Sequence, residues 1–407
     1  MTAIHAAYAR QSKASLQIQK PSIALFDSRK KIGAKILISG GTRCNVTNRL
    51  VRETDYWGAP KHFVRHVFKA FTPAQTIDFF KRIGVELVLE PSGKFFPATH
   101  SGRTVLEALI REVESQNVFL KTPVRVLDVE IEKEFFFLST RAEDGAPKQF
   151  FRARRVVLCT GGLSLPETGS DGVGLAIARK LGHEMVLTAP ALTPFKSQDK
   201  LWAELSGVAL KTRLDFYLNG KKKSESEGDF LFTHEGFSGP VCLDISRHFT
   251  TANLKDKPEI RACFLPSTGA HELSVELKSI SGATGTLFRF LNQKHGLPRR
   301  FAETMIRKCG WEGMDRLPDN WRAVFSQHLL NYPLEVSGVV GYRKAEVTAG
   351  GVDLKQVNIS SMESKKIKGL YFAGEILDVD GRIGGFNFQW SWSSGAVAGR
   401  SAMESLL

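Results

Sequence analysis

Three glycine-containing stretches of this 407-residue sequence have residue types suited to holding a flat, phosphorylated cofactor. Glycine allows backbone N–H groups to approach an anion closely, and small hydroxyl and amide side chains add further donors. The first stretch, residues 33–48, contains Gly40 and Gly41, with Lys35 and Arg43 as flanking cations. A Gly-Gly-Thr turn by itself also fits an ordinary polar loop. The case for a cofactor therefore depends on the other two stretches.

The second stretch follows an apolar run that predicts a strand at residues 156–158. Residues 159–162 (CTGG) then place small side chains at the carboxyl end of that strand, where open α/β sheets bind ligands. The segment 169–174 (GSDGVG) leads into a predicted helix, and exposed amides at a helix N-terminus favour phosphate. The alternative is a plain strand–loop–helix connection.

The third stretch, residues 369–395, is the most informative of the three. An acid after a strand end can accept hydrogen bonds from ribose or ribityl hydroxyls, a glycine pair lets a flat ring approach the backbone, and side-chain amides can meet the polar edge of that ring. We do not interpret the acids here as a metal site, because no histidine is near and the spacing matches no EF-hand loop. The residues concerned are Gly374, Glu375, Asp378, Gly384, Gly385, Asn387 and Gln389.

Hydrophobic periodicity indicates the elements that position these stretches. From about residue 190 the pattern changes to short strands and polar turns, and near residue 346 it returns to glycine-rich turns. We therefore predict one α/β domain built from residues 1–190 and 346–407, with an inserted domain at 191–345. Strands are expected at 23–27, 85–90, 124–132, 134–140, 149–158, 212–218, 229–233 and 369–373, and helices at the N-terminus, 61–83, 104–116, 171–181, 287–306 and 390–407.

The composition is that of an ordinary globular protein, with 56 Lys and Arg against 42 Asp and Glu, a net charge of +14. The five cysteines are widely spaced and form no CxxC pair, which favours a reducing cytoplasm. No long apolar run predicts a membrane span. The basic balance fits nucleic acid, a membrane surface or a phosphorylated cofactor. The basic runs 29–31, 221–223 and 299–300 lack interleaved aromatic residues, so we favour a small-molecule substrate over nucleic acid.

Taken together, these stretches resemble the bacterial flavoproteins known as NAD(P)/FAD-dependent oxidoreductases, a family that includes an aminoacetone oxidase and a bile-acid ene-reductase. The resemblance covers nearly the whole chain. It implies a glutathione-reductase-like FAD-binding domain of Rossmann type, interrupted by an inserted β-barrel plus helical domain. It also implies an oxidoreductase whose non-covalent FAD carries the hydride. The reductant is left open between NAD(P)H, bound transiently, and the substrate itself, and the reduced flavin either passes the hydride on or reacts with oxygen. The stretches are residues 31–48, 157–174, 231–246, 347–354, 361–381 and 384–395.

The same resemblance implies roles for individual residues. Asp27, where the family often has Glu, would bind the adenosine ribose, and the backbone near Val126 would meet the adenine. His100 and His234 are candidates for catalysis, although a lone histidine is more often structural. Cys44 lies among the cofactor-lining residues. Because disulfide-reductase chemistry needs a nearby pair of cysteines and the sequence has none, Cys44 is interpreted as a packing residue. The implied lining residues are Lys35, Ser39, Gly40, Gly41, Arg43, Cys44 and Asn45; Thr160, Gly161 and Gly162; Gly374, Glu375 and Asp378 for the ribityl–pyrophosphate part; and Gly384, Gly385, Asn387 and Gln389 for the isoalloxazine.

The sequence departs from the family in one place. The family has a first strand and a GxGxxG turn ahead of the segment that corresponds here to residues 3–10, and this sequence has neither. Two explanations compete: the active protein is longer, or the protein is a degenerate relative that binds FAD poorly and acts as a binding or interaction protein. We favour the first, because the other motifs are intact. An RNA-associated flavoprotein is a further alternative; the substrate and the oligomeric state are left open.

Overall fold

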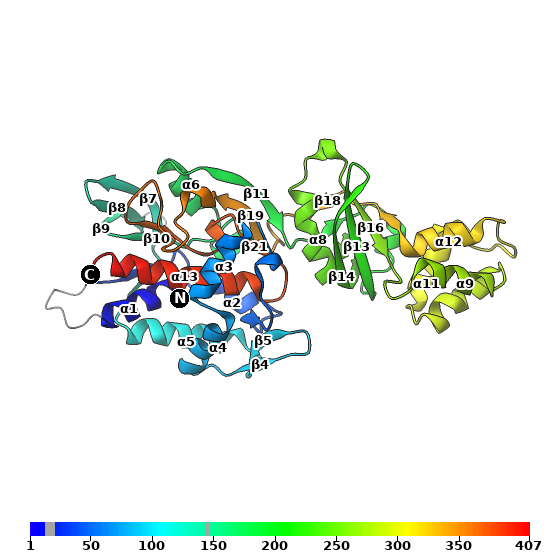
Figure 1. Cartoon of the computed structure of the whole chain (residues 1–407), viewed down its shortest axis with the longest axis horizontal. Helices are drawn as coiled ribbons and strands as arrows, with labels where there is room; N and C mark the ends of the chain where they lie inside the picture. The colour runs from blue at the N-terminus through cyan, green and yellow to red at the C-terminus, as the bar shows by residue number, and fades with distance from the viewer. Residues whose placement is uncertain (13–20, 143–145) are drawn as a thin grey trace. The chain divides into compact units, whose positions relative to one another are not determined.

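The computed structural model describes residues 1–12, 21–142 and 146–407, and the chain divides into two compact units (Figure 1). Unit 1 comprises Met1–Thr188 and Val347–Leu407, and unit 2 comprises Ala189–Glu346. These limits lie within two residues of the boundaries expected from the change in sequence pattern. Unit 1 is thus assembled from both ends of the chain.

Four parallel strands of unit 1 form two separate pairs. Strand β1 (Ala24–Phe26) pairs with β6 (Phe119–Lys121), and β10 (Val156–Leu158) pairs with β20 (Leu370–Phe372). Within the described residues no ladder joins β1 to β10, so the parallel sheet is open between them. The β10–β20 pair lies in the core of unit 1, as expected for parallel strands covered on both faces.

Helices pack against these strands. Helices α1 (Thr2–Ser12) and α13 (Phe386–Glu404) lie side by side, so close that a Cβ atom on Gly399 would overlap the Thr2 backbone (Figure 1). The structure begins this last helix earlier than the expected residue 390. It starts at Phe386, directly after Gly385, whose φ is 91°. The other helices of unit 1 are α2 (Ala34–Ile38), α3 (Lys61–Ala70), α4 (Pro73–Arg82), α5 (Gly102–Ser115) and α6 (Val173–Lys180).

Two single elements expected from the sequence are each divided in the structure. The segment 61–83 forms α3 and α4, because the Thr72 hydroxyl accepts a hydrogen bond from the Gln75 N–H at 3.1 Å and begins a new helix. The segment 149–158 forms β9 (Gln149–Ala153) and β10, and only β9 continues the antiparallel sheet β7–β8–β9. The remaining strands of this sheet are β7 (Arg125–Glu132) and β8 (Phe135–Arg141).

Short antiparallel strands connect the remaining segments of unit 1. One sheet has the order β2–β5–β4, β3 pairs with β21, and β11 pairs with β19. Their bounds are β2 (Thr47–Asn48), β3 (Tyr56–Trp57), β4 (Leu87–Leu89), β5 (Lys94–Pro97), β11 (Met185–Ala191), β19 (Val347–Val352) and β21 (Asp380–Gly381).

Unit 2 contains a seven-stranded sheet in the order β17–β16–β13–β14–β15–β12–β18. Its two end strands are separated by only residues 335–337, so the sheet must curl until its edges approach each other. This agrees with the barrel expected for the insert. The strands are β12 (Phe195–Lys196), β13 (Ala209–Leu218), β14 (Lys221–Thr233), β15 (Gly236–Ser238), β16 (Glu259–Cys263), β17 (Tyr332–Leu334) and β18 (Gly338–Val339).

Helices complete unit 2. The helix expected at 287–306 is broken into α10, a short π-helical segment and α11, because Gly296 and Pro298 interrupt it. Among the residues that the structure describes, no helix is long and apolar enough to cross a membrane. The helices are α7 (Lys200–Ala203), α8 (Pro240–Thr250), α9 (Ala270–Lys278), α10 (Thr284–Arg289), α11 (Arg299–Lys308) and α12 (Trp321–Leu330).

Candidate cofactor site

The loop after α2 has an unusual run of left-handed backbone. Gly40, Gly41, Thr42 and Cys44 all have φ between 55° and 70°. Consecutive conformations of this kind turn backbone N–H groups toward one side and create a concave site for oxygen atoms. Gly41 is exposed, and a Cβ atom there would meet nothing within 4 Å. This loop therefore presents bare backbone to a ligand.

The start of α13 packs directly against this segment. Gly384 and Gly385 have φ of 120° and 91°, and a Cβ atom on Gly385 would lie 2.8 Å from Asn45 Oδ1. The Asn48 amide donates to the Gly384 carbonyl at 3.0 Å. The N-cap residue of α13 is Gly385, which has no side chain to cap the helix, and the N-terminus of a helix favours oxygen-bearing ligands.

A network of polar side chains joins all three sequence stretches. Lys35 Nζ lies 2.7 Å from Glu375 Oε2 and donates to Ser164 Oγ at 2.7 Å, and the Ser164 hydroxyl in turn donates to Glu375 Oε1 at 2.5 Å. The Glu375 and Lys35 side chains are only 14% and 26% exposed. The stretch around α2, the loop after β10 and the loop after β20 are therefore held together by one charged cluster.

Thr348 completes this network from β19. Its hydroxyl accepts from the backbone N–H groups of Leu163 and Ser164 at 2.8 and 3.0 Å and donates to Glu375 Oε1 at 2.9 Å. The Thr348 N–H donates to the same oxygen at 3.0 Å. The carboxylate of Glu375 is thus nearly saturated, whereas the Lys35 ammonium keeps one N–H beyond its two bonds. Lys35 is the member of the cluster best able to contact a ligand.

One buried atom tests whether the site suits a cofactor. Asn45 is 8% exposed, and its Oδ1 has no hydrogen-bond partner within the described structure. A buried acceptor without a partner costs about 1–3 kcal/mol. An N–H or O–H donor on a bound cofactor, together with the bare glycine backbone beside Asn45, would remove that cost. The residues present therefore fit a flat group with polar edges.

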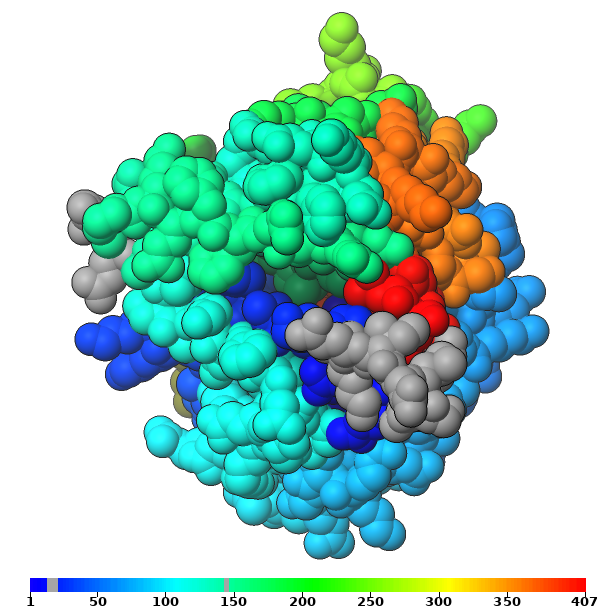
Figure 2. Space-filling view, turned by 90° about the vertical axis from the view of Figure 1, so that its left-hand side faces the viewer, coloured from blue at the N-terminus to red at the C-terminus, as the bar shows by residue number. Residues whose placement is uncertain are grey.

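The side of the site that would receive the nucleotide is open. Asp27 follows β1, accepts a hydrogen bond from the Arg29 N–H at 2.8 Å, and has a pKa raised by burial. Thr160 follows β10 and is exposed, as are Ala24 on β1 and Cys159 at the end of β10. Figure 2 shows the surface hollowed between the N-terminal segment in blue and the segment that contains β10 in green.

Glycines also shape the loop after β10. A Cβ atom on Gly162 would overlap the Thr348 side chain, and one on Gly161 would lie 2.8 Å from Ser170 Oγ. Gly374, after β20, has φ 75° and donates its N–H to Ser394 Oγ at 2.9 Å. Val126, on β7, is half-buried opposite Thr140.

Several residues expected to line the cofactor are occupied elsewhere, and we omit two of them from the proposed binding set. Gln389 is fully buried, and its amide bonds to Thr47, Thr76 and Ser393 at 2.6–2.9 Å. Cys44 is fully buried, and burial raises the pKa of its thiol to about 12. Neither side chain reaches a surface that a ligand could contact.

Four further residues make mainly structural contacts. Asn387 uses its amide to hold the backbone of Gly381 at 2.8 and 2.9 Å. Arg43 pairs with Glu90 at 2.6 Å and lies over the Phe96 ring at 4.0 Å. Asp378 is 9% exposed and lies against Gly58, where a Cβ atom would overlap it. The Ser39 hydroxyl bonds to the Ile36 carbonyl at 3.0 Å.

The two histidine candidates lie in different units. His100 is exposed with φ 51° after β5, in unit 1, and His234 is exposed between β14 and β15 of unit 2. Sequence reasoning missed Ser164 and Thr348 as members of the polar cluster. Both lie in stretches that resemble the family, but only the fold shows that their hydroxyls meet Glu375. Within the described residues, no group of three or more potential metal ligands gathers.

Two pairs of parallel strands, glycine-rich loops and covering helices give unit 1 the organisation of a Rossmann-type domain, and the family match assigns it to the flavoproteins whose cofactor is FAD. Residues 10–401 match the family described as "HI0933-like protein Rossmann domain", and the chain belongs to that family. Its class is that of FAD-dependent oxidoreductases.

Relatives of known name match over nearly the full length. The chain is 32% identical to a 3-dehydro-bile acid delta(4,6)-reductase of Clostridium scindens, over 94% of this chain and 93% of the relative. It is 31% identical to a ribosomal RNA dihydrouridine synthase of Escherichia coli, over 91% and 90%. The E. coli quinol fumarate reductase subunit FrdA matches with a TM-score of 0.50 at 15% identity, over 99% of this chain and 68% of that one, which shows a shared fold alone.

Proposed function

We propose that this protein is an FAD-dependent reductase that delivers hydride to a carbon–carbon double bond conjugated with a carbonyl group. The observation that carries the proposal is the convergence of the glycine loop at residues 40–45, the start of α13 and the Lys35–Glu375 cluster. The name of the Clostridium relative supports this substrate class, since a delta(4,6)-reductase reduces double bonds.

In this proposal the chain itself binds and orients the cofactor. Bound FAD would supply the hydride chemistry. The backbone at Gly40 and Gly41 and the first turn of α13 would face its oxygen atoms, and Asn45 Oδ1 would accept a hydrogen bond from it. Glu375 would hold Lys35 in place, while the free N–H of Lys35 would contact a cofactor oxygen.

The electron and proton balance of the reaction is simple. Hydride adds to the carbon furthest from the carbonyl group, the carbonyl oxygen takes up the negative charge, and a proton then completes the saturated product. NAD(P)H would return two electrons to the oxidised cofactor. His100 and His234 are the candidates for the proton donor.

Anaerobic spectroscopy of the purified protein tests this function. We expect a visible spectrum with flavin bands that bleach with NADH or NADPH and return when a conjugated enone such as 4-androstene-3,17-dione is added. Lys35→Met should weaken flavin retention, whereas Lys61→Met, on the exposed surface of α3, should not. If neither this protein nor a form extended by a strand and a GxGxxG turn holds FAD after incubation with it, the proposal is overturned and an interaction protein is favoured.

A second candidate substrate is a uridine base in RNA. Two relatives, from E. coli and Haemophilus influenzae, are named ribosomal RNA dihydrouridine synthases, and uracil also contains a double bond conjugated with a carbonyl. The positive charge supports this candidate, since unit 1 has 34 Lys and Arg against 24 Asp and Glu. Mass spectrometry of ribosomal RNA from cells with and without the protein would distinguish the two substrates, because reduction of a uridine adds two hydrogen atoms to the base.

A further inference from the structure

The outer face of the sheet β7–β8–β9 carries phenylalanine side chains that the fold does not bury. In β8, Phe136 and Leu138 are buried, whereas Phe135 and Phe137 on the opposite face are half-exposed. In the edge strand β9, Phe150 is 71% exposed and lies opposite Ser139. Side chains at alternate positions of a strand share a face, so these phenylalanines form one apolar surface. Large exposed aromatic groups of this kind commonly mark a binding site.

Basic side chains lie beside these rings. Arg152 lies opposite Phe137 in the β8–β9 ladder. The guanidinium groups of Arg152 and Arg154 lie 4.6 and 5.9 Å from the centre of the Phe135 ring. Lys148 lies just before β9 and, like Phe150, lines the pocket described below. Both arginines and Lys148 are exposed, and among residues 1–12, 21–142 and 146–407 no ion pair joins any of these three to an acid.

The acidic residues of the same face lie on β7, at its other side. Asp128 and Glu130 share Lys180 from α6, and Glu132 lies opposite Phe135. The β9 side of the face is therefore basic and the β7 side acidic. An anionic partner would therefore be attracted to the side where the exposed phenylalanine lies.

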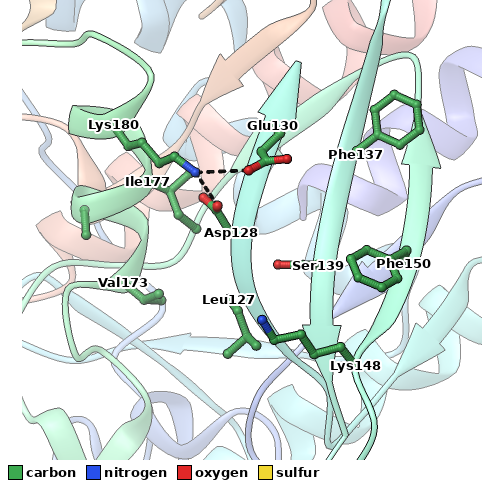
Figure 3. Close-up of a pocket in the computed structure, with 11 residues that line it drawn as sticks. Leu127, Asp128, Glu130, Phe137, Ser139, Lys148, Phe150, Val173, Ile177 and Lys180 are labelled. Carbon is green, nitrogen blue, oxygen red and sulfur yellow. Dashed lines mark hydrogen bonds and ion pairs between the residues drawn. The ribbon is translucent and has the colours of Figure 1, made fainter. Parts of the chain in front are cut away.

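A pocket of about 540 Å³ lies between this face and α6. Its lining includes Phe137, Phe150 and Ser139 from the sheet and Val173 and Ile177 from α6 (Figure 3). In Figure 3, Lys148 lies at the end of the pocket opposite the Lys180 ion pairs. A flat, partly polar ring has both an apolar wall and a hydroxyl group to contact here.

We propose that this face, defined by Phe135, Phe137, Phe150, Arg152 and Arg154, binds single-stranded RNA. Unstacked bases would stack on the phenylalanine rings, and the arginines with Lys148 would contact phosphates. Sheets that expose aromatic side chains beside cations recognise single strands in this way, because each base has an apolar face whereas a duplex hides it. The proposal goes beyond the reductase function, and it would supply the means of holding RNA if the second candidate substrate is correct.

Binding can be measured without any flavin chemistry, so its failure would leave the reductase proposal intact. The probe is a fluorescein-labelled 15-nucleotide oligouridine, titrated with the purified protein and followed by fluorescence anisotropy without reductant. Phe150→Ala should weaken binding about tenfold, the loss expected for one stacked base. The control Phe119→Ala removes a phenylalanine that is 58% exposed on β6, outside this face, and should change nothing.

The salt dependence tests the arginines separately. Each phosphate contact contributes about 0.7 to the slope of log K against log salt for a single strand, so Arg152→Gln with Arg154→Gln should reduce that slope by about 1.4. The double control Lys61→Gln with Lys69→Gln removes the same charge from the exposed side of α3 and should leave the slope unchanged. Circular dichroism and thermal melting would verify that every variant is folded.

Four results would overturn the proposal. These are an absence of binding at low salt, equal losses in the variants and their controls, tighter binding to duplex than to single strand, and a wild-type dimer that Phe150→Ala dissociates. A fifth result would do the same. If the protein floats with phosphatidylserine vesicles and Phe150→Ala abolishes this, the face binds a lipid surface and not RNA.

Discussion

On one side of the proposed cofactor site, around Lys35 and Glu375, the polar groups are bonded to each other; on the other side, β1 and β10 each present an unpaired strand edge. The first side is preorganised, because Glu375 accepts from Ser164, Thr348 and Lys35 without any ligand. On the second side, no ladder joins β1 to β10 within the described residues. In the proposed site the flavin ring would therefore contact side chains that are already hydrogen-bonded in place. The nucleotide part would lie where β1 and β10 do not pair with each other.

The largest expected effect comes from completing the open side. A strand followed by a GxGxxG turn, fused ahead of Met1, should pair with β1 and β10 and add backbone N–H donors for the pyrophosphate. Two charge-assisted hydrogen bonds, at about 1.5–3 kcal/mol each, would tighten FAD binding ~100-fold or more. Flavin fluorescence titration of both forms measures this. A fused sequence of equal length with the glycines changed to valine is the control, and equal affinities of all three forms would contradict the idea.

The next effect comes from breaking the closed side. Lys35→Met leaves the poorly exposed Glu375 carboxylate without its cation, and we expect the free energy of unfolding to fall by about 2–3 kcal/mol. Lys180→Met removes a cation whose side chain is 53% exposed, and the loss should be clearly smaller because water screens that pair. Urea unfolding of the two variants gives the comparison directly. Similar losses would show that the Lys35 cluster is not a special stabilising feature.

The positions of the cofactor-binding stretches could be predicted from the sequence, whereas the hydrogen bonds of their side chains could not. Glycine pairs and strand–turn patterns are local signals, so the stretches around Gly40, Gly161 and Gly384 could be located without coordinates. The bonding of side chains is not local. Gln389 was expected at the ring edge, yet it points into the core because Thr47, Thr76 and Ser393 surround it. The predicted helix boundaries were wrong where a capping residue begins a new helix, as Thr72 does.

A smaller effect would show whether Thr348 is a positioning residue of the closed side. Thr348→Val leaves the N–H groups of Leu163 and Ser164 without an acceptor and removes a donor to Glu375, at a cost of about 1–2 kcal/mol. Thr348→Ser keeps the hydroxyl and should restore both stability and flavin binding. A structural role alone would alter the melting temperature of the valine variant. A positioning role would also shift the visible absorption maximum of its bound flavin, and the serine variant should reverse that shift.

The smallest effect at neutral pH concerns His5 on α1, the helix that packs beside α13. His5 Nε2 is buried without a partner, and the ring lies 5.0 Å from Phe71. Burial, together with nearby positive charges, lowers the pKa of His5 to about 3. Below pH 6.5 His5 takes up a proton in the unfolded chain but not in the folded chain. The free energy of unfolding should therefore fall by about 1.4 kcal/mol per pH unit between pH 6.5 and about 3.

The variant His5→Phe tests this pH dependence. It should be nearly neutral at pH 7, since the ring keeps its aromatic neighbours, and it should flatten the fall in stability toward low pH. Urea unfolding from pH 7 to pH 4.5 compares the two proteins, and parallel pH curves would show that His5 titrates normally in the folded state.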